Sequence, residues 1–165
     1  MFTAQQLITQ YQLQPHPEGG YYLQTYCSNE KIPVEALPDR FSGNRHFSTA
    51  IYFLLEGTQF SSFHRIQSDE LWHFYTGIGL HIYVLHADGR GEVLKLGDEL
   101  ANGYSFQQVV PAGSWLLQSP SVRKGFIVGC TVAPGFDFTD FELAEKEMLL
   151  KEFPQYKEWI MMLCR

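Results

Sequence analysis

The chain has 165 residues, a formal net charge of −6 and an apolar fraction of 45%. This length favours one domain over residues 1–165, and no cluster of Lys and Arg points to nucleic acid or an anionic membrane as a partner. No apolar run approaches the roughly 20 residues that cross a bilayer, and the three scattered cysteines predict neither disulfides nor a thiolate zinc site, so we expect a soluble, cytoplasmic protein.

The first predicted element is a short helix near the start of the chain. Thr3 and Gln6 stand at capping-box spacing, and the apolar side chains of Leu7, Ile8 and Tyr11 follow at helical intervals. The helix is expected to end before LQPHPEGG, because two prolines and two glycines disfavour regular structure.

From residue 21 onward the chain consists of short aromatic or alternating runs. Clusters of Gly, Asp, Asn and Pro separate these runs, a pattern typical of a β-sandwich or barrel. The stretch 28–45 is predicted to be a mobile loop. The predicted strands cover residues 21–26, 48–55, 60–66, 70–75, 80–86, 92–96, 105–110 and 125–132.

The pattern becomes helical again near the end of the chain. Thr139 and Glu142 form a second possible capping box, and Pro154 stands where a last helix would begin. The chain is therefore predicted to be an all-β domain with short helices at both ends. The apolar stripes of the two final helices would be Phe141, Ala144 and Met148 in the first, and Tyr156, Trp159, Ile160 and Leu163 in the second.

The segment HRIQSDELWHFYTG (64–77) resembles the first motif of the cupin superfamily. His64, Glu70 and Gly77 keep the spacing of a histidine, a glutamate and a glycine in that motif, whereas Ile66 replaces its second histidine. In the stretch that resembles the second motif, Leu116 stands where a histidine belongs. HPEGGYY, SDELWHFYTG, VVPAGSW and GCTVAPGFDFTDFELA are similar to the largely uncharacterised Cupin-5 branch. The resemblance implies a double-stranded β-helix (jelly-roll) barrel, commonly dimeric, without a known substrate.

Strand parity indicates which of these side chains share a face. Alternate residues of a strand point the same way, so His64 and Ile66 would face the barrel interior if the resemblance holds. Glu70, Trp72 and Phe74 would do the same from the next predicted strand. His73 should point outward unless a bulge intervenes.

A metal centre needs about three protein ligands, and these inward positions supply one imidazole and one carboxylate. We therefore expect no cofactor, with a weakly bound divalent metal as the alternative. A third ligand would have to come from His16 or Glu18 in HPEGG, or from His73. HPEGG itself is either a lid that contributes His16 and Glu18 or a glycine-rich turn, and the turn requires fewer assumptions.

Without a metal, His64 and Glu70 are the predicted catalytic acid–base pair. A nearby carboxylate favours the protonated imidazole and burial disfavours it, which together can bring a histidine pKa near neutrality. Metal-free cupins that epimerise nucleotide-linked keto-sugars use a histidine with a tyrosine, and this chain resembles them only in the barrel and the inward histidine. The alternative is structural, each group satisfying the hydrogen bonds of the other.

The predicted function is binding of a small polar or sugar-like metabolite, with a metal-independent isomerase or epimerase reaction. A non-catalytic binding protein and a metal-dependent oxygenase-type cupin are the alternatives. A homodimer is expected, because a second protomer can cover an open edge of the jelly roll. The side chains predicted to contact the ligand are Ile66, Trp72, Phe74, Trp115 and Leu116.

Overall fold

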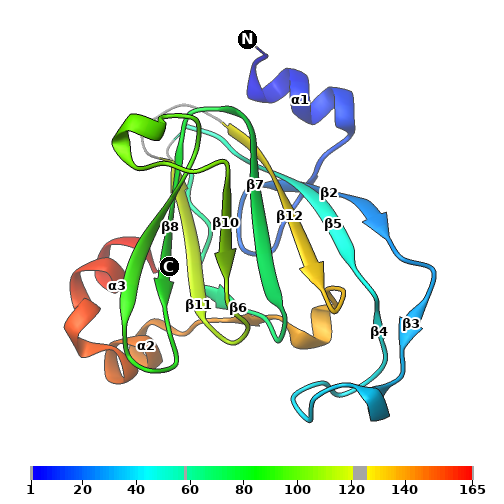
Figure 1. Cartoon of the computed structure of the whole chain (residues 1–165). Helices are drawn as coiled ribbons and strands as arrows, with labels where there is room; N and C mark the ends of the chain where they lie inside the picture. Colours follow the sequence, from blue (N-terminus) through cyan, green and yellow to red (C-terminus); the bar gives the residue numbers. More distant parts are fainter. Residues whose placement is uncertain (1, 58, 121–125, 165) are drawn as a thin grey trace.

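Two antiparallel sheets face each other in the computed structural model, which describes residues 2–57, 59–120 and 126–164 (Figure 1). The predicted all-β fold with short helices at both ends is confirmed. The first sheet has the order β1 (Gln14–Pro15), β2 (Tyr21–Cys27), β5 (Thr49–Leu55), β12 (Phe126–Ala133), β7 (Asp69–Gly77) and β10 (Gln107–Val110). The second has the order β13 (Glu142–Leu143), β6 (His64–Arg65), β11 (Trp115–Pro120), β8 (Leu80–Leu85) and β9 (Gly91–Leu96).

The stretch 28–45, predicted to be a mobile loop, contains ordered elements. β3 (Lys31–Ile32) pairs with β4 (Arg45–His46), and the short 3-10 helix η1 (Val34–Ala36) lies between them. A further 3-10 helix, η2 (Leu100–Asn102), precedes β10. Among the described residues, no helix combines the length and the apolar character needed to cross a membrane.

The structure shortens one predicted strand and contains a long strand that the sequence did not indicate. The strand expected over 60–66 is reduced to β6, because the amides before it bond to different partners: Ser61 donates to Gln118 and Ser62 to Glu18. β11 has no counterpart among the predicted strands. Its first four residues are all buried, so it lacks the alternation that marks a strand with one wet face.

Two apolar cores lie on opposite sides of the second sheet. The first fills the space between the sheets and includes Trp72 and Leu116. The second lies between the outer face of the second sheet and the C-terminal helices, and it includes Trp115 and Leu117. The alternation along β11 sends these neighbours to different cores, which is why the strand is buried on both faces.

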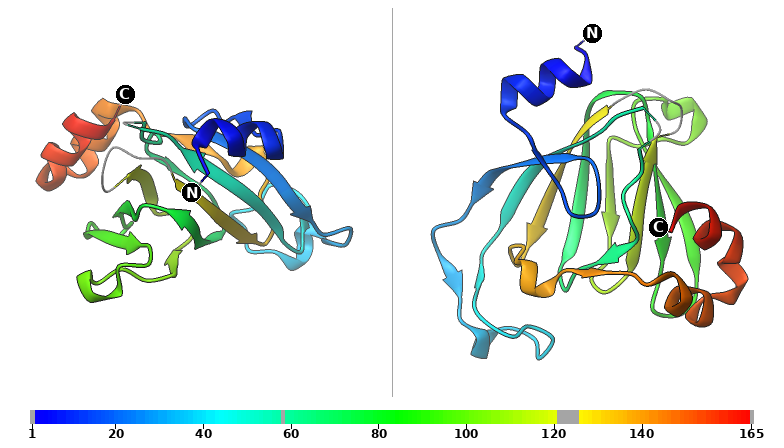
Figure 2. Two further views of the ribbon diagram at one scale, coloured as in Figure 1. Left: turned by 90° about the horizontal axis from the view of Figure 1, so that it is seen from above. Right: turned by 180° about the vertical axis from the view of Figure 1, so that it is seen from behind.

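The helices differ in how firmly they join the sheets. The Thr3 capping box is confirmed at the start of α1 (Ala4–Tyr11), a helix without buried residues that stands away from the sheets in Figures 1 and 2. α2 (Lys146–Glu152) and α3 (Lys157–Leu163) pack beside the second sheet and bury the expected Ile160 and Leu163.

The capping box predicted at Thr139 and Glu142 is wrong. These residues lie in the 3-10 helix η3 (Phe138–Asp140) and in β13, and α2 begins only at Lys146. The side chain of Asp137 accepts a hydrogen bond from the Thr139 amide, while β13 pairs with β6. A further 3-10 helix, η4 (Pro154–Tyr156), joins α2 to α3.

Candidate functional site

A cavity of about 230 Å³ lies against the inner face of the first sheet. Its wall combines ionisable side chains with a large aromatic and aliphatic surface. The lining residues are His16, Glu18, Tyr22, Gln24, Thr49, Ile51, His64, Ile66, Glu70, Trp72, Cys130, Val132, Phe136, Phe138 and Phe141.

His64 is fully engaged on both ring nitrogens. Its Nδ1 lies 2.8 Å from the Ser62 carbonyl oxygen, and its Nε2 lies 3.0 Å from Glu18 Oε2. A carbonyl oxygen can only accept, so Nδ1 carries a proton, and the carboxylate favours a second proton on Nε2. Burial lowers the pKa of His64, but the charge and hydrogen bond of Glu18 and the charge of Glu70 outweigh it and raise the pKa to about 9. The ring is therefore an imidazolium at neutral pH.

The HPEGG turn supplies the partner of His64. Within it the Gly19 amide donates to the His16 carbonyl oxygen, and the Glu18 carbonyl oxygen accepts from Ser62. Gly20 has φ +75°, and a Cβ at this position would lie 2.6 Å from the Leu54 carbonyl oxygen of β5. Only glycine allows this close approach, which presses the turn against the sheet. The segment is thus a tight turn that also brings His16 and Glu18 to the cavity.

Glu70 lies on β7 in the same cavity and has a different environment. Its Oε2 is 3.6 Å from the Cys130 thiol, and its Oε1 has no hydrogen-bond partner in the described part of the chain. Burial raises the pKa of Glu70, His64 lowers it and Glu18 raises it, for a net value of about 7. The indole of Trp72 also lowers this pKa, although its N–H falls short of hydrogen-bond geometry with any acceptor. Glu70 can therefore exchange a proton near neutrality.

An aromatic lip borders the cavity, formed by Phe136, Phe138 and Phe141. Phe136 and Phe138 lie 5.0 Å apart between ring centroids, and Phe138 is half exposed, so it marks the side of the cavity nearest to solvent. The ring of His16 stacks on Phe138, and burial lowers the pKa of His16. His16 is therefore neutral beside the positively charged His64.

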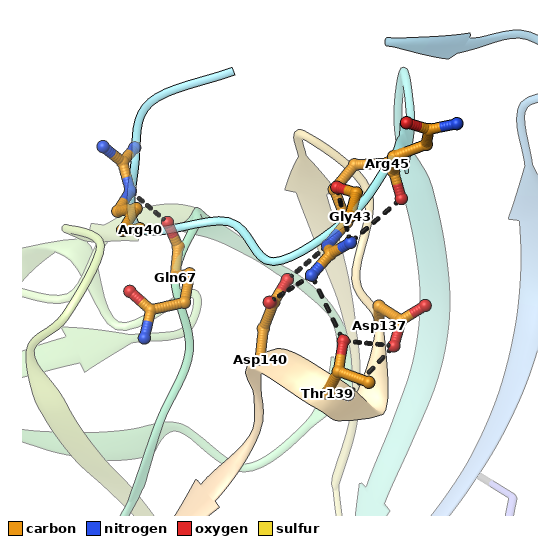
Figure 3. A network of polar contacts seen from close by, with 8 residues as sticks. Arg40, Gly43, Arg45, Gln67, Asp137, Thr139 and Asp140 are labelled. Atoms are coloured by element: carbon orange, nitrogen blue, oxygen red, sulfur yellow. Dashed lines mark hydrogen bonds and ion pairs between the residues drawn. The ribbon is translucent and has the colours of Figure 1, made fainter. Parts of the chain in front are cut away.

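A buried ion pair fixes this lip to the hairpin β3–β4 (Figure 3). Arg45 Nη2 lies 2.5 Å from Asp140 Oδ1, and Arg45 also donates to the Gly43 carbonyl oxygen and the Thr139 hydroxyl. Asp140 belongs to η3, the same turn as Phe138. The guanidinium therefore positions the turn that carries the most exposed side chain of the lip.

The structure brings four of the seven predicted site residues to the cavity wall: His64, Ile66, Glu70 and Trp72. Phe74 lies one pleat further along β7 and packs against the inter-sheet core beyond the cavity. Leu116 pairs with His64 across β11 and β6 but is enclosed in the same core.

Trp115 is also absent from the cavity wall. It faces the C-terminal helices, with the Arg65 guanidinium 4.3 Å from its ring. Since successive residues of a strand point to opposite faces, Trp115 and Leu116 cannot both face one cavity, and the prediction of ligand contact for both conflicts with this parity.

His73 points outward, as expected. Its Nε2 lies 3.0 Å from the Thr131 hydroxyl and its Nδ1 lies 3.1 Å from the Gln107 side chain. The lining residues that the prediction left unassigned come from four segments: Tyr22 and Gln24 from β2, Thr49 and Ile51 from β5, Cys130 and Val132 from β12, and Phe136, Phe138 and Phe141 from the segment 136–141. The signal for the last segment was the Phe-rich run GFDFTDF, whose spacing suits neither a helix stripe nor a continuous strand.

The side chains of the cavity do not fit a metal ion as they are arranged. The described residues contain no group of three or more His, Cys, Asp or Glu side chains disposed to hold one. Both nitrogens of His64 already face acceptors, so neither offers a lone pair to a metal. Ile66 contributes hydrocarbon to the wall, which adds no ligand.

The comparisons with known proteins identify the family. The family described as Cupin superfamily (DUF985), or Cupin_5, matches residues 5–144. The chain belongs to this family. Among solved structures, protein SO0799 of Shewanella oneidensis is similar over 100% of this cupin chain and 99% of its own, with 36% identity and a TM-score of 0.89. A hypothetical protein from Leishmania major is 31% identical, with a TM-score of 0.86 and 99% of each chain covered.

A curated relative of this cupin is the uncharacterized protein YML079W of Saccharomyces cerevisiae. The two are 36% identical over 159 residues, which cover 90% of this chain and 79% of the yeast protein. The two-sheet arrangement is accordingly the double-stranded β-helix of cupins. None of these relatives brings a substrate with its description.

Proposed function

We propose that this cupin binds a small polar, sugar-like metabolite in the cavity and uses His64 and Glu70 in an isomerase- or epimerase-type reaction. The supporting observation is the environment of Glu70: a buried carboxyl group whose Oε1 has no partner, in the wall of a cavity. A purely structural pair would satisfy its own hydrogen bonds, because unpaired buried polar groups are costly. The expected direct pair of His64 with Glu70 is replaced by His64 with Glu18.

The pKa values divide the chemistry between the two groups. Glu70, with a pKa of about 7, is the proton acceptor, and His64, with a pKa of about 9, is the proton donor. The Glu70 carboxylate takes a proton from a carbon next to a carbonyl group, and the electron pair of that C–H bond moves toward the carbonyl oxygen. His64 donates the proton that this oxygen needs. Glu70 then returns a proton to the carbon while the enol oxygen gives its proton back to His64, which restores the carbonyl group and completes the isomerisation.

A thermal-shift screen over sugars, nucleotide-sugars and small acids tests the binding, and exchange of carbon-bound hydrogen in D₂O, followed by NMR, tests the reaction. We expect a folded His64→Ala variant to lose the ligand-induced shift, and Glu70→Gln to lose hydrogen exchange. His73→Ala, on the outer face, is the matched control. Strong destabilisation by His64→Ala with unchanged binding would instead assign His64 a structural role.

Binding without catalysis is a second candidate, and the engagement of His64 on both nitrogens favours it. An imidazolium held by Ser62 and Glu18 resembles a fixed charge more than a proton shuttle. A ligand that binds stoichiometrically and shows no hydrogen exchange in wild-type protein would select this candidate.

We also propose a homodimer in the cytoplasm. The edge strand β10 supports the dimer, because Val109 and the adjacent Phe106 are exposed there. The cytoplasm is supported by Cys27, Cys130 and Cys164, which form no disulfide. Size-exclusion chromatography with light scattering tests the dimer, and a monomer at micromolar concentration would contradict it.

A further inference from the structure

The ionisable side chains of the cavity wall leave one negative charge without a positive partner. Glu18 and His64 form a pair at 3.0 Å, so their opposite charges largely cancel. His16 is neutral, because burial lowers its pKa. Among the described lining residues there is no Lys or Arg. Among the described residues of this wall, Glu70 is therefore the one carboxylate that lacks a counter-charge of its own.

The groups that face Glu70 confirm this imbalance from each neighbouring element. From β6, His64 attracts the Glu70 carboxylate, and from the HPEGG turn, Glu18 repels it. From β12, Cys130 offers only a weak thiol donor to Oε2. On β7 itself, the Trp72 indole lowers the pKa of Glu70 but does not reach hydrogen-bond geometry. An ionised Glu70 thus needs a cation or strong donor at Oε1, and the described residues supply none.

The rest of the wall suits a cation. Aromatic rings attract cations within about 6 Å of their centroids, and the effect grows when the cation is desolvated. No guanidinium or ammonium group of the described residues lies over the rings of this wall. The His64 imidazolium lies 5.5 Å from the Phe141 ring, but Glu18 neutralises its charge. The aromatic residues of the wall are His16, Tyr22, Trp72, Phe136, Phe138 and Phe141.

We propose that the cavity takes a small organic monocation, an amine or quaternary ammonium compound, with its positive nitrogen beside Glu70 and the aromatic rings. The inference rests on the proposed function, since it names the ligand class of the same cavity. The Trp72 N–H has no partner and can donate a hydrogen bond to an oxygen atom on the ligand. An amino alcohol would therefore pair its nitrogen with Glu70 Oε1 and its oxygen with the Trp72 N–H. Anions are rejected, because the uncancelled charge of the wall is negative.

The volume limits the size of this cation. At about 230 Å³ the cavity is smaller than the roughly 300–1,000 Å³ of pockets for drug-sized ligands. A nucleotide does not fit inside together with a second moiety. The compounds that match have a single charged head and a short polar arm.

Choline, its uncharged isostere 3,3-dimethylbutan-1-ol and the anionic 3,3-dimethylbutanoate form a charge series of nearly constant shape. Isothermal titration calorimetry with the full chain is expected to show choline binding at least tenfold tighter than the alcohol, and no binding of the acid. Glu70→Gln should weaken choline at least tenfold and leave the alcohol unchanged. Glu142→Gln, an exposed carboxylate outside the cavity, is the matched control.

The pH dependence gives a measurement that needs no variant. Choline does not titrate, and it favours ionised Glu70, so its affinity should rise about tenfold per pH unit below pH 7 and level off above it. If the alcohol or neutral sugars bind in the cavity as tightly as choline, the cation class is overturned while the proposed function stands. If Mn²⁺ or Zn²⁺ binds stoichiometrically at Glu70 and displaces choline, the ligand is a metal instead. If no probe or screened metabolite binds in the cavity, both proposals fail.

Discussion

The two buried tryptophans lie in regions that look alike in sequence and differ in what covers them. Trp72 and Trp115 are both almost fully buried, and neither indole N–H has a hydrogen-bond partner in the described structure. Trp115 is sealed beneath α2 and α3, whereas Trp72 borders a cavity whose lip is a short aromatic segment. The cover over each buried region therefore decides whether a cavity forms. The helices α2 and α3 close the region around Trp115, whereas the aromatic lip leaves a cavity beside Trp72.

The largest expected effect separates the two regions by stability. Phe153→Ala in the helix-covered core should cost about 3–5 kcal/mol of unfolding free energy, because Phe153 is 1% exposed and the substitution leaves a void. It should leave choline affinity unchanged. Phe138→Ala on the lip should cost about 0.5 kcal/mol or less, since the side chain is 51% exposed.

Urea denaturation and calorimetry measure both quantities. For Phe138→Ala we expect choline affinity to fall about two- to fivefold, the equivalent of a partly exposed cation–aromatic contact. A stable Phe153→Ala variant with altered choline affinity would show that the two cores are coupled.

The second expected effect concerns how the lip is held. Asp140→Asn should destabilise the protein by about 3 kcal/mol, because it leaves the buried Arg45 guanidinium without its counter-charge. The exposed pair Arg65–Glu142 is the comparison, and Glu142→Gln should cost about 1 kcal/mol or less. Thermal denaturation of both variants measures this difference, and equal losses would mean that the buried pair does not anchor the lip.

The third expected effect is on how the free energy of unfolding changes with pH. We expect Glu70 and His64, both in the cavity wall, to make the largest contributions. The folded-state pKa of Glu70 is raised from 4.5 to about 7, so the folded protein holds a proton that the unfolded chain releases in this range. Stability therefore falls as pH rises from 4.5 to 7. The pKa of His64 is raised from 6.5 to about 9, so its contribution is complete below pH 6.5 and is lost as pH rises to 9.

Glu70→Gln isolates the first of these two windows. Relative to wild type, the variant should gain about 1–3 kcal/mol between pH 4.5 and 8, because it lacks the unfavourable buried ionisation. Denaturant titrations at several pH values measure the gain. A constant difference across this range would mean that Glu70 titrates normally.

The smallest effect compares the two tryptophans directly. Trp72→Phe removes the N–H that we assign to the oxygen of the ligand and should lower choline affinity about two- to tenfold, the usual worth of one neutral hydrogen bond. Trp115→Phe, which makes the same chemical change in the closed core, should leave affinity unchanged. Equal losses for both variants would remove Trp72 from the ligand contacts.

The sequence predicted the parts of this comparison that depend on local periodicity. The inward positions of His64, Ile66, Glu70 and Trp72 follow from alternation along two strands, and so does the outward position of His73. The same rule should have separated Trp115 from Leu116. Motif resemblance placed Leu116 at the cavity, and Trp115 was predicted there as a ring that could contact a ligand. The alternation of β11 places only Leu116 on the inner side of the sheet.

The remaining features depend on contacts between distant segments, which no local pattern encodes. Glu18 reaches His64 because Gly20 allows its turn to approach β5, and HPEGG alone does not reveal that contact. Arg45 and Asp140 are 95 positions apart, each in a segment without periodicity. The partner of His64 and the anchor of the lip are therefore both products of the tertiary fold.

The position of β12 in the first sheet has a consequence for the order in which the protein can assemble. This strand pairs with β5 on one side and β7 on the other, yet it follows both by many residues in the chain. During synthesis, β5 and β7 leave the ribosome before β12, so the edges that pair with β12 stay open until it emerges. Sheets closed by such late, long-range pairing nucleate slowly and are prone to aggregate meanwhile, so recombinant yield should depend on growth temperature and on chaperone supply.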